Sequence, residues 1–381
     1  MKTTGSCAPS LPNYSRNSSK QKNIRTTAVQ RLEVSSSPVT KSSSWLRGRW
    51  PFGRSVQTGV AGGEGASFPA TDEGGQQGSE LSKQQKAEKV SWNLEAGAQI
   101  AEGRSILKRL SGGNRYEVFL TWDDRLFAIT VTKILRPDQA EDAHALNELR
   151  REVEVLRGLA HPCLVRCFDA VLEGPYPHVM LEHLEGPTLR RLIKQQTTIP
   201  LDQLLPLALH VAAVLQYMAN EGFVHLDVKP SNIVMGVPPR LIDLSIAQSF
   251  ESAAQLRHSI GTDPYMPPEQ CDPAAHPGGI GHAADVWGLG ATLYHAVTGE
   301  TPFPRGDAKS KDRTLRFPQL VEEPKPLPRY VPPALQELIS SMLAKNSAER
   351  PAASDVASAL EPLVALISPR LKASRRGIHV R

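Results

Sequence analysis

A short stretch near the middle of the chain, FVHLDVKPSNIVM (residues 223–235), carries four polar residues between two apolar runs. They are His225, Asp227, Lys229 and Asn232. A carboxylate, an ammonium group and an amide this close together can accept a proton, neutralise an anion and offer an oxygen ligand to a metal ion. Phosphoryl transfer requires these functions, because it depends mainly on holding the phosphates and aligning an acceptor hydroxyl.

A second segment, RLIDLS (240–245), places Asp243 directly after an apolar run. In the expected site, Asp227 accepts or orients the proton of the acceptor hydroxyl, and Lys229 stabilises the transferring phosphoryl group. Asn232 and Asp243 supply oxygen ligands to Mg²⁺, which needs few protein ligands. Taken alone, Asp243 is a turn residue at a strand end, and its combination with Asn232 is what favours a metal ligand.

A glycine-bearing turn, LSGGNRYEV (110–118), lies between two strand-like runs earlier in the chain. Gly112 and Gly113 have no side chains, so the backbone amides there can approach phosphate oxygens closely. The alternative is an ordinary hairpin turn. Tyr116 weakens the phosphate interpretation, because its ring either covers the phosphates or folds away from them.

Lys133, in the segment TVTKILRPDQ, is a candidate to neutralise nucleotide phosphates. A lone lysine on a strand is more often exposed to solvent. A carboxylate on the following helix would orient the ammonium group and couple the helix position to activity. Glu152 is the expected partner, because its distance from the His-Pro pair at 161–162 fits better than that of its rivals Glu148 and Glu154.

Periodicity predicts the elements that must position these residues. Short β-branched or aromatic runs predict strands, and apolar residues at helical spacing in DAHALNELRREVEVLRGLA (142–160) predict one helix among them. After about residue 188 the pattern is mostly helical. Strands with one helix, followed by helices, indicate an α+β fold with a small β-rich lobe and a larger helical lobe. The predicted strands are ILKRL, YEVFLTW, LFAITVTKIL and HVMLEHL, and the predicted later helices run from near Asp202 to Gly222 and over 284–298, 333–344 and 353–366.

The two ends of the chain differ from this region in composition. Residues 1–95 are rich in Ser, Thr, Gly, Gln and Lys, without a sustained apolar period. Such a segment cannot bury enough surface to offset the entropy of ordering, so a disordered leader is expected. A flexible basic tail is expected at 367–381. Removal of the leader up to residue 90 should then leave the melting temperature nearly unchanged.

The net charge of +5 is unevenly distributed. Residues 1–60 carry +9 and residues 370–381 carry +5, so the segment between them carries −9. The basic ends can contact anionic partners or a membrane surface, although such runs are more often simply solvated. No specific nucleic-acid-binding core is expected, because the central region is acidic.

Targeting signals are sparse. The chain shows no recognisable secretory signal and no expected transmembrane segment. Its four cysteines form no CxxC pair, which favours a reduced compartment. We expect a cytoplasmic location; the Ser- and Arg-rich, acid-poor start leaves an organelle transit peptide as the alternative.

Taken in order, these motifs resemble the signature set of eukaryotic-type, bacterial-like serine/threonine protein kinases. The resemblance extends from about residue 104 to 366. HLDVKPSN is similar to the family motif H-R-D-x-K-x-x-N, IDLS is similar to the D-F-G site, and VTKILRPD is similar to the lysine strand. GTDPYMPPEQ (261–270) is similar to the segment G-T-x-x-Y-M-A-P-E, and DVWGLG (285–290) is similar to the helix that anchors the catalytic loop. NSAERP (346–351) is similar to the late arginine motif, which implies that Arg350 pairs with Glu269.

The resemblance implies a bilobal kinase fold, ATP and Mg²⁺ as cofactors, and protein substrates with Ser or Thr acceptors. Lys229 together with Thr262 resembles the serine/threonine-specific pattern, in which Thr262 lies beside Asp227 and Lys229. The adenine is expected at a hinge near residues 182–184, with Leu181 gating the back pocket. The implied nucleotide-contacting residues are Leu110, Gly112, Gly113, Val118, Val131, Lys133, Glu152, Glu182 and Leu184.

The chain departs from the family pattern in its glycine motif and its D-F-G site. Against L-G-x-G-x-x-G-x-V, only Gly113 matches, since Ser111 and Tyr116 stand where the outer glycines are usual. Ser245 replaces the glycine of D-F-G, whose backbone freedom helps the aspartate to flip. These departures favour the alternative of a pseudokinase, a folded nucleotide-binding scaffold or interaction module.

Leu226 replaces the arginine that pairs with a phosphorylated activation loop. Because that arginine is regulatory, its loss does not argue against catalysis. We expect an active serine/threonine kinase that does not depend on activation-loop phosphorylation. A small-molecule kinase is disfavoured, since GTDPYMPPEQ builds a protein-substrate platform in the family that the chain resembles.

Overall fold

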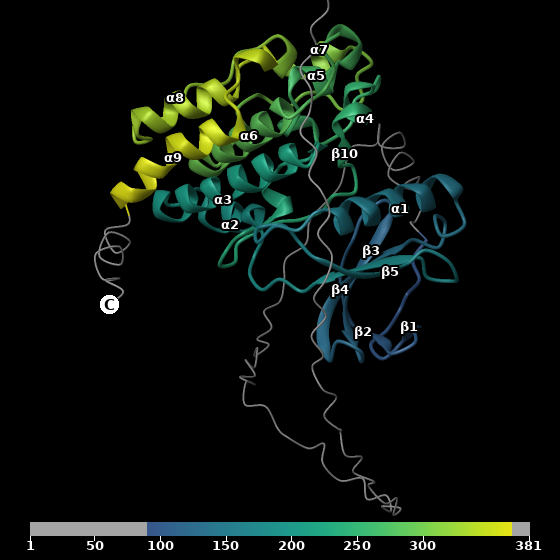
Figure 1. Cartoon of the computed structure of the whole chain (residues 1–381). Coiled ribbons are helices and arrows are strands. Elements are labelled where there is room, and N and C mark those ends of the chain that lie inside the picture. Colours follow the sequence, from purple (N-terminus) through teal and green to yellow (C-terminus); the bar gives the residue numbers. More distant parts are fainter. Residues whose placement is uncertain (1–89, 368–381) are drawn as a thin grey trace, which may run out of the picture. The chain divides into compact units, whose positions relative to one another are not determined.

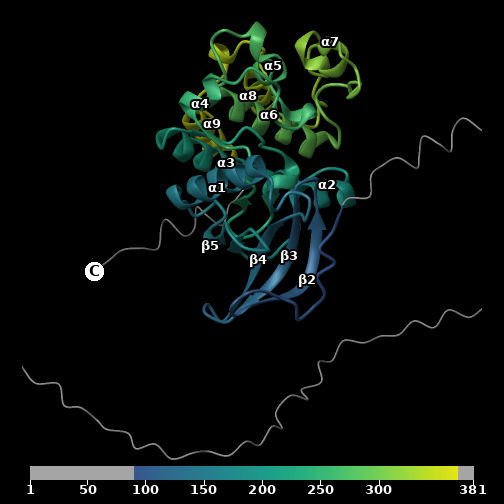
Figure 2. The same ribbon diagram turned by 90° about the vertical axis from the view of Figure 1, so that its right-hand side faces the viewer.

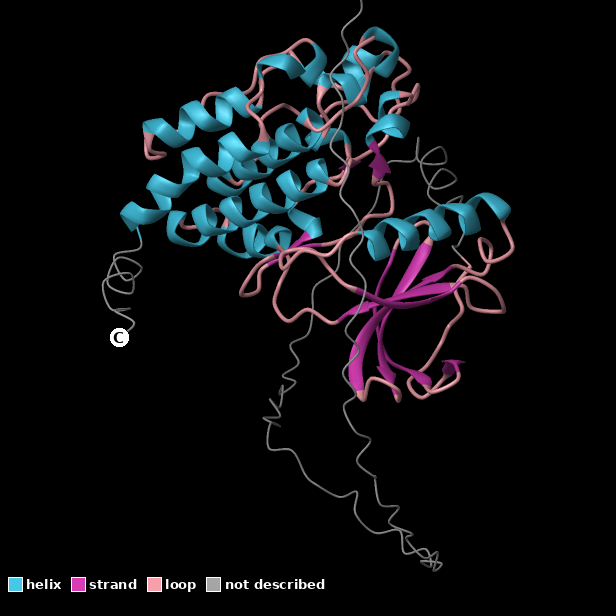
Figure 3. Ribbon diagram, in the orientation of Figure 1, coloured by secondary structure: helices cyan, strands magenta, loops and turns pink. Residues whose placement is uncertain are grey.

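The computed structural model describes residues 90–367, which form a strand-rich lobe followed by a helical lobe (Figures 1 and 2). Coloured by secondary structure, most of the strands gather in the first lobe and most of the helices in the second; helix α1 beside the sheet and short strands at the helical lobe are the exceptions (Figure 3). The predicted α+β bilobal class is confirmed.

The sheet of the first lobe has six antiparallel strands in the order β1-β2-β3-β4-β6-β5. Its side chains alternate between two faces, as the strand period requires. One face of β3 is buried, and Phe119 packs there with Ile100, Ile106 and Ile134. The strands are β1 (Gln99–Ala101), β2 (Arg104–Gly112), β3 (Tyr116–Asp123), β4 (Ala128–Leu135), β5 (Cys167–Val171) and β6 (His178–Glu182).

Helix α1 (Ala143–Gly158) confirms the helix predicted among the strands. Asp142 caps its start, because its carboxylate accepts a hydrogen bond from the Ala145 amide at 2.7 Å. The apolar stripe that predicted the helix is largely buried, with Leu149 and Val153 in the main core. This packing places Glu152, on the same buried face, next to the sheet.

The helical lobe confirms the remaining predicted helices to within a few residues. Its long helix α3 also passes a length and composition test for a membrane span, but nine of its residues are buried inside the lobe, as in a core helix. The helices are α2 (Leu189–Gln196), α3 (Leu201–Asn220), α4 (Phe250–Ala254), α5 (Pro268–Cys271), α6 (Ala283–Thr298), α7 (Arg313–Arg316), α8 (Pro333–Met342) and α9 (Ala353–Ile367).

Two short antiparallel strand pairs hold the motif residues between the lobes. β7 (Phe223–Val224) pairs with β10 (Gln248–Ser249), and β8 (Ile233–Val234) pairs with β9 (Arg240–Leu241). The segment between β7 and β8 carries the HLDVKPSN motif, and Asp243 follows β9. The pairing therefore brings two motifs that are separated in sequence to one place.

The expected leader boundary at residue 95 is wrong for its last six residues. Ser91 Oγ and the Trp92 amide donate to the Glu117 carboxylate at 2.6 and 3.0 Å, and Trp92 Nε1 donates to the Leu135 carbonyl at 2.7 Å. The Trp92 ring also meets Tyr176 edge to face. Residues 90–95 are part of the folded lobe because a buried carboxylate needs these donors; the leader residues 1–89 and tail residues 368–381 lie outside the described residues.

Candidate active site

The backbone of the HLDVKPSN loop is fixed by a buried carboxylate on α6. Asp285 accepts hydrogen bonds from the amides of His225 and Leu226 at 2.7 and 2.8 Å. Leu226 has a positive φ of 67°, a conformation that costs a non-glycine residue about 1–3 kcal/mol. Burial raises the pKa of Asp285, while His225 and the two amides oppose that rise. The two amide bonds thus offset the backbone strain and aim the following residue, Asp227.

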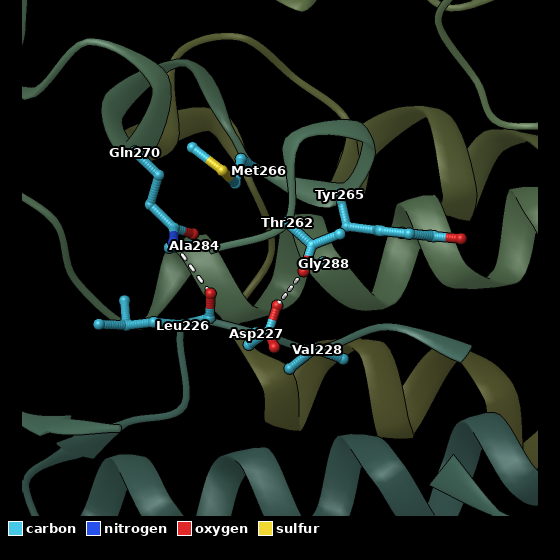
Figure 4. Close-up of a pocket in the computed structure, with 9 residues that line it drawn as sticks. All are labelled: Leu226, Asp227, Val228, Thr262, Tyr265, Met266, Gln270, Ala284 and Gly288. Carbon is cyan, nitrogen blue, oxygen red and sulfur yellow. Dashed lines mark hydrogen bonds between the residues drawn. The ribbon is translucent and has the colours of Figure 1, made fainter. Parts of the chain in front are cut away.

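Asp227 lies at the centre of a hydrogen-bonded cluster, and Figure 4 shows its contact with Thr262. Its Oδ1 accepts from Thr262 Oγ1 at 2.7 Å, and its Oδ2 accepts from Lys229 Nζ at 2.5 Å. Lys229 Nζ also donates to Thr262 Oγ1 at 2.7 Å. Asn232 Nδ2 donates to the Asp227 carbonyl and to its Oδ2 at 3.0 and 3.1 Å. The structure therefore brings together the residues predicted as catalytic, in protein-held orientations.

Lys133 faces this cluster from the sheet lobe. Its ammonium group donates to Glu152 at 2.6 Å and to Asp243 at 2.9 Å, so the predicted Lys133–Glu152 ion pair is present. Glu148, a rival partner, instead pairs with Arg115. Burial alone would lower the pKa of Lys133, but the carboxylates of Asp243 and Glu152 outweigh it and raise the pKa above its usual range. Lys133 thus stays positively charged.

Asp243 and Asn232 fit the donor chemistry of a magnesium site. Burial would raise the pKa of Asp243, but the Lys133 ammonium and hydrogen bonds from Lys133 and Ser245 lower it well below its usual range, so the carboxylate is ionised. Asn232 points its amide nitrogen at Asp227, which leaves Oδ1 with one weak donor, Ser231 Oγ at 3.4 Å. Two hard oxygen ligands suit Mg²⁺ when phosphate and water complete the shell.

The glycine-bearing turn adopts the hairpin alternative in this structure. The Gly113 amide donates to the Tyr116 carbonyl at 2.9 Å, and Arg136 Nε donates to the Gly113 carbonyl at 2.8 Å. The Gly113 amide is therefore engaged within the turn rather than directed at a phosphate. A Cβ at Gly112 would meet only the guanidinium ends of Arg109 and Arg136, at 2.9 and 3.1 Å, and these flexible side chains can move aside.

Tyr116 folds inward beneath this turn. Its ring centroid lies 4.8 Å from Lys133 Nζ. The Tyr116 side chain packs against the main hydrophobic core. Burial, and secondarily the Glu152 carboxylate, raise the pKa of the phenol far above its usual value, so it stays neutral. The ring therefore covers Lys133 in a way that a glycine at this position would not.

The other implied nucleotide residues are distributed along the sheet and the hinge. Val118 pairs with Lys133 across β3 and β4, and Val131 lies on the same face of β4. The side chain of Glu182 is held by Arg166, whose amide donates to it at 2.9 Å. Leu184 packs against the main core. Val118, Val131 and Lys133 are thus brought onto one face, while Leu110 is half exposed at the end of β2.

Two stabilising features surround the cluster. Arg350 and Glu269 form the expected ion pair, with two hydrogen bonds of 2.6 and 2.9 Å.

Gln270 was not predicted from the sequence. Its buried amide nitrogen donates to the Leu226 carbonyl at 2.9 Å and to the Ile260 carbonyl at 2.7 Å. Its only sequence signal was its place next to Glu269. Arg136 was likewise missed, although it follows the lysine strand.

Comparison with known proteins identifies the family. The model of the protein kinase domain matches residues 105–360. The chain belongs to the protein kinase family. Among bacterial relatives, it is 32% identical over 203 residues to the serine/threonine-protein kinase PknB of Mycobacterium leprae, covering 51% of this chain and 32% of that protein.

Other relatives give the same picture. The chain is 31% identical to PknB of Mycolicibacterium smegmatis, over 63% of this chain and 39% of that protein. It is 32% identical to the serine/threonine-protein kinase PkaA of Streptomyces coelicolor, over 60% of this chain and 42% of that protein. The matches thus span well under half the length of these curated relatives. The family predicted from the motifs is confirmed.

Proposed function

We propose that the protein is an active serine/threonine protein kinase that transfers the γ-phosphoryl group of ATP to Ser or Thr hydroxyls of protein substrates. The observation that carries the proposal is the contact of Asp227 with Lys229, Thr262 and Asn232, facing the bonded Lys133, Glu152 and Asp243. The names of the bacterial relatives support the same activity.

The proposal gives each residue one step. Asp227 accepts the proton of the acceptor hydroxyl. At the same time the hydroxyl oxygen forms a bond to the γ-phosphorus, and the bond between the γ-phosphorus and the β-phosphate oxygen breaks. Lys229, already beside the Asp227 carboxylate, neutralises charge on the group in transit. Lys133 orients the α- and β-phosphates from its ion pair with Glu152. Asn232 and Asp243 would hold Mg²⁺, which neutralises the phosphate oxygens when bound.

Asp227→Asn tests this proposal. The wild-type protein with Mg-ATP and a generic Ser/Thr protein substrate should transfer phosphate, and the variant should lose activity by about 10³-fold or more, because the proton acceptor is gone. Nucleotide binding should persist in the variant. If both proteins bind nucleotide and neither transfers phosphate, the protein is a pseudokinase, a function favoured by the engaged Gly113 amide and by Ser245.

We further propose that activity does not require phosphorylation of the activation loop. Leu226 is 3% exposed, although an arginine that receives a phosphate must reach solvent. It joins an apolar cluster that contains residues from the loop itself, so burial takes the place of a phosphate–arginine pair. The cluster consists of Val224, Leu226, Ala253, Ile280 and Ala284, with Ile246, Leu256 and Ile260 packed against it.

The test of this second proposal is direct. Phosphatase-treated protein, and a variant with Ser249, Ser252 and Ser259 all replaced by alanine, should keep activity within about twofold of the untreated protein. Ser249 also caps α4 through its contact with the Ser252 amide, so the variant's melting temperature should be measured alongside. A loss of tenfold or more after phosphatase treatment would contradict the proposal.

A further inference from the structure

A groove of about 750 Å³ lies beside the site on the helical lobe. Its lining comes from four places in the chain: helix α2 with the adjoining Thr197, residues 261–265, His295 of α6, and the region 299–319. Thr262 is part of the lining and also donates to the Asp227 carboxylate. The groove therefore borders the place where an acceptor hydroxyl would meet Asp227, so a polypeptide bound there can extend into it.

The charged residues of this groove are almost all cationic. Arg190 and Lys194 are four residues apart on α2, so they share one face of the helix. Arg305 and Arg316 line the groove from the segment that follows α6, and the one acid in the lining is Asp263. A basic groove is unexpected in a region of the chain, residues 61–369, that carries a net charge of −9.

Most of this positive charge is uncompensated. Asp263 pairs with Arg316 at 3.3 Å. Within residues 90–367, no ion pair involves Arg190, Lys194 or Arg305, and all three are exposed. Three cations around one groove repel one another, and an anionic occupant would relieve that repulsion.

The groove lining also contains a hydrogen-bonded pair of aromatic side chains that adds no positive charge. Tyr265 Oη and His295 Nδ1 are hydrogen-bonded at 2.7 Å on the lining. Burial lowers the pKa of His295, and the Arg190 guanidinium lowers it further. His295 is thus neutral near neutral pH, and the cationic character of the groove comes from its arginines and lysine.

We propose that this groove selects protein substrates with several Asp or Glu residues close to the phosphoacceptor Ser or Thr. The inference rests on the proposed kinase function and adds its substrate class. Long-range attraction between the groove cations and these carboxylates raises the local concentration of acidic segments, and close pairs fix their register. The chain's own basic ends, +9 and +5, are repelled by the same field.

Matched peptides test the proposal. Each peptide has one central Thr and four flanking residues, which are all Glu, all Gln or all Lys. The Glu peptide is made in two versions, one with its Glu residues before the Thr and one with them after it. The value of kcat/KM should be at least tenfold higher for an acidic peptide than for the Gln peptide, and lowest for the Lys peptide. This preference should shrink as salt rises from 50 to 300 mM, because the pairs are exposed.

Charge reversal on α2 supplies the matched variants. Arg190→Glu with Lys194→Glu should reduce the acidic-to-neutral ratio at least fivefold, and Arg305→Glu should reduce it independently from another segment. Arg191→Glu is the control, because Arg191 is exposed on the same helix but does not line the groove. A ratio that the groove variants leave unchanged, or that Arg191→Glu lowers as much, would overturn the proposal.

Binding by fluorescence anisotropy separates this proposal from the kinase function. If no peptide is phosphorylated, the acidic peptide should still bind at least fivefold more tightly than the Gln peptide, and the groove variants should abolish the difference. Equal binding of both peptides would sink the proposal whatever the activity. Displacement of the labelled acidic peptide is also measured with a single-stranded oligonucleotide and with unlabelled acidic peptide. If the oligonucleotide displaces it at the lower concentration, the proposal of an acidic protein substrate is overturned.

Discussion

At the scale of single residues, the polar residues of the site match the family motifs, whereas Tyr116 stands where the family pattern has a glycine. The motif residues Asp227, Asn232 and Asp243 were predicted because their types and spacing are tied to one reaction, and the structure brings them together. The position of Tyr116 was left open in the sequence, because nothing local decides whether a ring at a turn points inward. The structure places it over Lys133.

Tyr116→Gly should tighten ATP binding by about threefold or more, or about 0.6 kcal/mol. The Tyr116 ring occupies space next to Lys133 Nζ, and the phosphates must displace it. Calorimetric titration with Mg-ATP measures the change. Tyr116→Phe is the control, since it keeps the ring and should bind like the wild type; tighter binding by the Phe variant alone would point to the hydroxyl instead.

At the scale of elements, long periodic segments were predicted well and short ones were not. The helix α6 was predicted as 284–298 and runs from Ala283 to Thr298, because its pattern repeats over four turns. The strand β1 and the helix α2 were missed, since three and eight residues give too little periodicity. The basic groove was also missed, because its cations come from segments far apart in the sequence.

Gln270 makes a prediction at this scale, because it joins the catalytic loop to the activation segment. Gln270→Glu should lower both the unfolding free energy and kcat, since a carboxylate cannot donate to the Leu226 and Ile260 carbonyls. Each unsatisfied buried carbonyl costs about 1–3 kcal/mol. Gln270→Met, which removes the donor without adding charge, should be less harmful. Equal effects of the two variants would show that charge repulsion plays no part.

A buried network between strands predicts a dependence on pH. His178 Nε2 lies 2.6 Å from Arg104 Nη1, and His178 Nδ1 lies 2.6 Å from the Tyr176 carbonyl. Because Nδ1 must donate to the carbonyl, Nε2 accepts from the guanidinium and the ring is neutral. Burial, and secondarily Arg104, lower the pKa of His178 from 6.5 to about 4.

The sign of the pH effect follows from that lowered pKa. Stability from neutral His178 is complete above pH 6.5 and is lost as the pH falls towards 4. The unfolding free energy at pH 5 should be about 2 kcal/mol below its value at pH 7.5 from this group alone. Urea unfolding of wild type and His178→Gln measures it, and the variant should lose less on acidification. An identical loss in both would exclude His178 as the source.

At the scale of the whole molecule, the folded unit begins earlier than composition suggests. Residues 90–95 were assigned to the leader because they follow a stretch rich in Ser, Thr, Gly, Gln and Lys, and the hydrogen bonds of Trp92 are made with residues 25 to 43 positions away. Such long-range partners leave no local periodicity. The outer face of the sheet is therefore completed by a segment that pattern analysis assigns elsewhere.

Two truncations test this boundary. A chain that begins at Gly97 should have a lower melting temperature than one that begins at Val90, because Glu117 loses the donors Ser91 and Trp92 and keeps only Arg109. The loss of buried hydrogen bonds alone costs about 1–3 kcal/mol. Differential scanning calorimetry of the two chains gives the answer, and equal melting temperatures would mean that residues 90–96 contribute nothing to stability.

The apolar contacts around Leu226 have a consequence for how the molecule responds to cold. A phosphate–arginine pair is an electrostatic contact that a phosphatase can remove, whereas burial of Leu226 against Ala253 and Ile280 is built into the sequence. Apolar burial weakens as water is cooled, because its driving force near room temperature is entropic. We therefore expect the packing of residues 246–260 around Leu226 to weaken as the temperature falls.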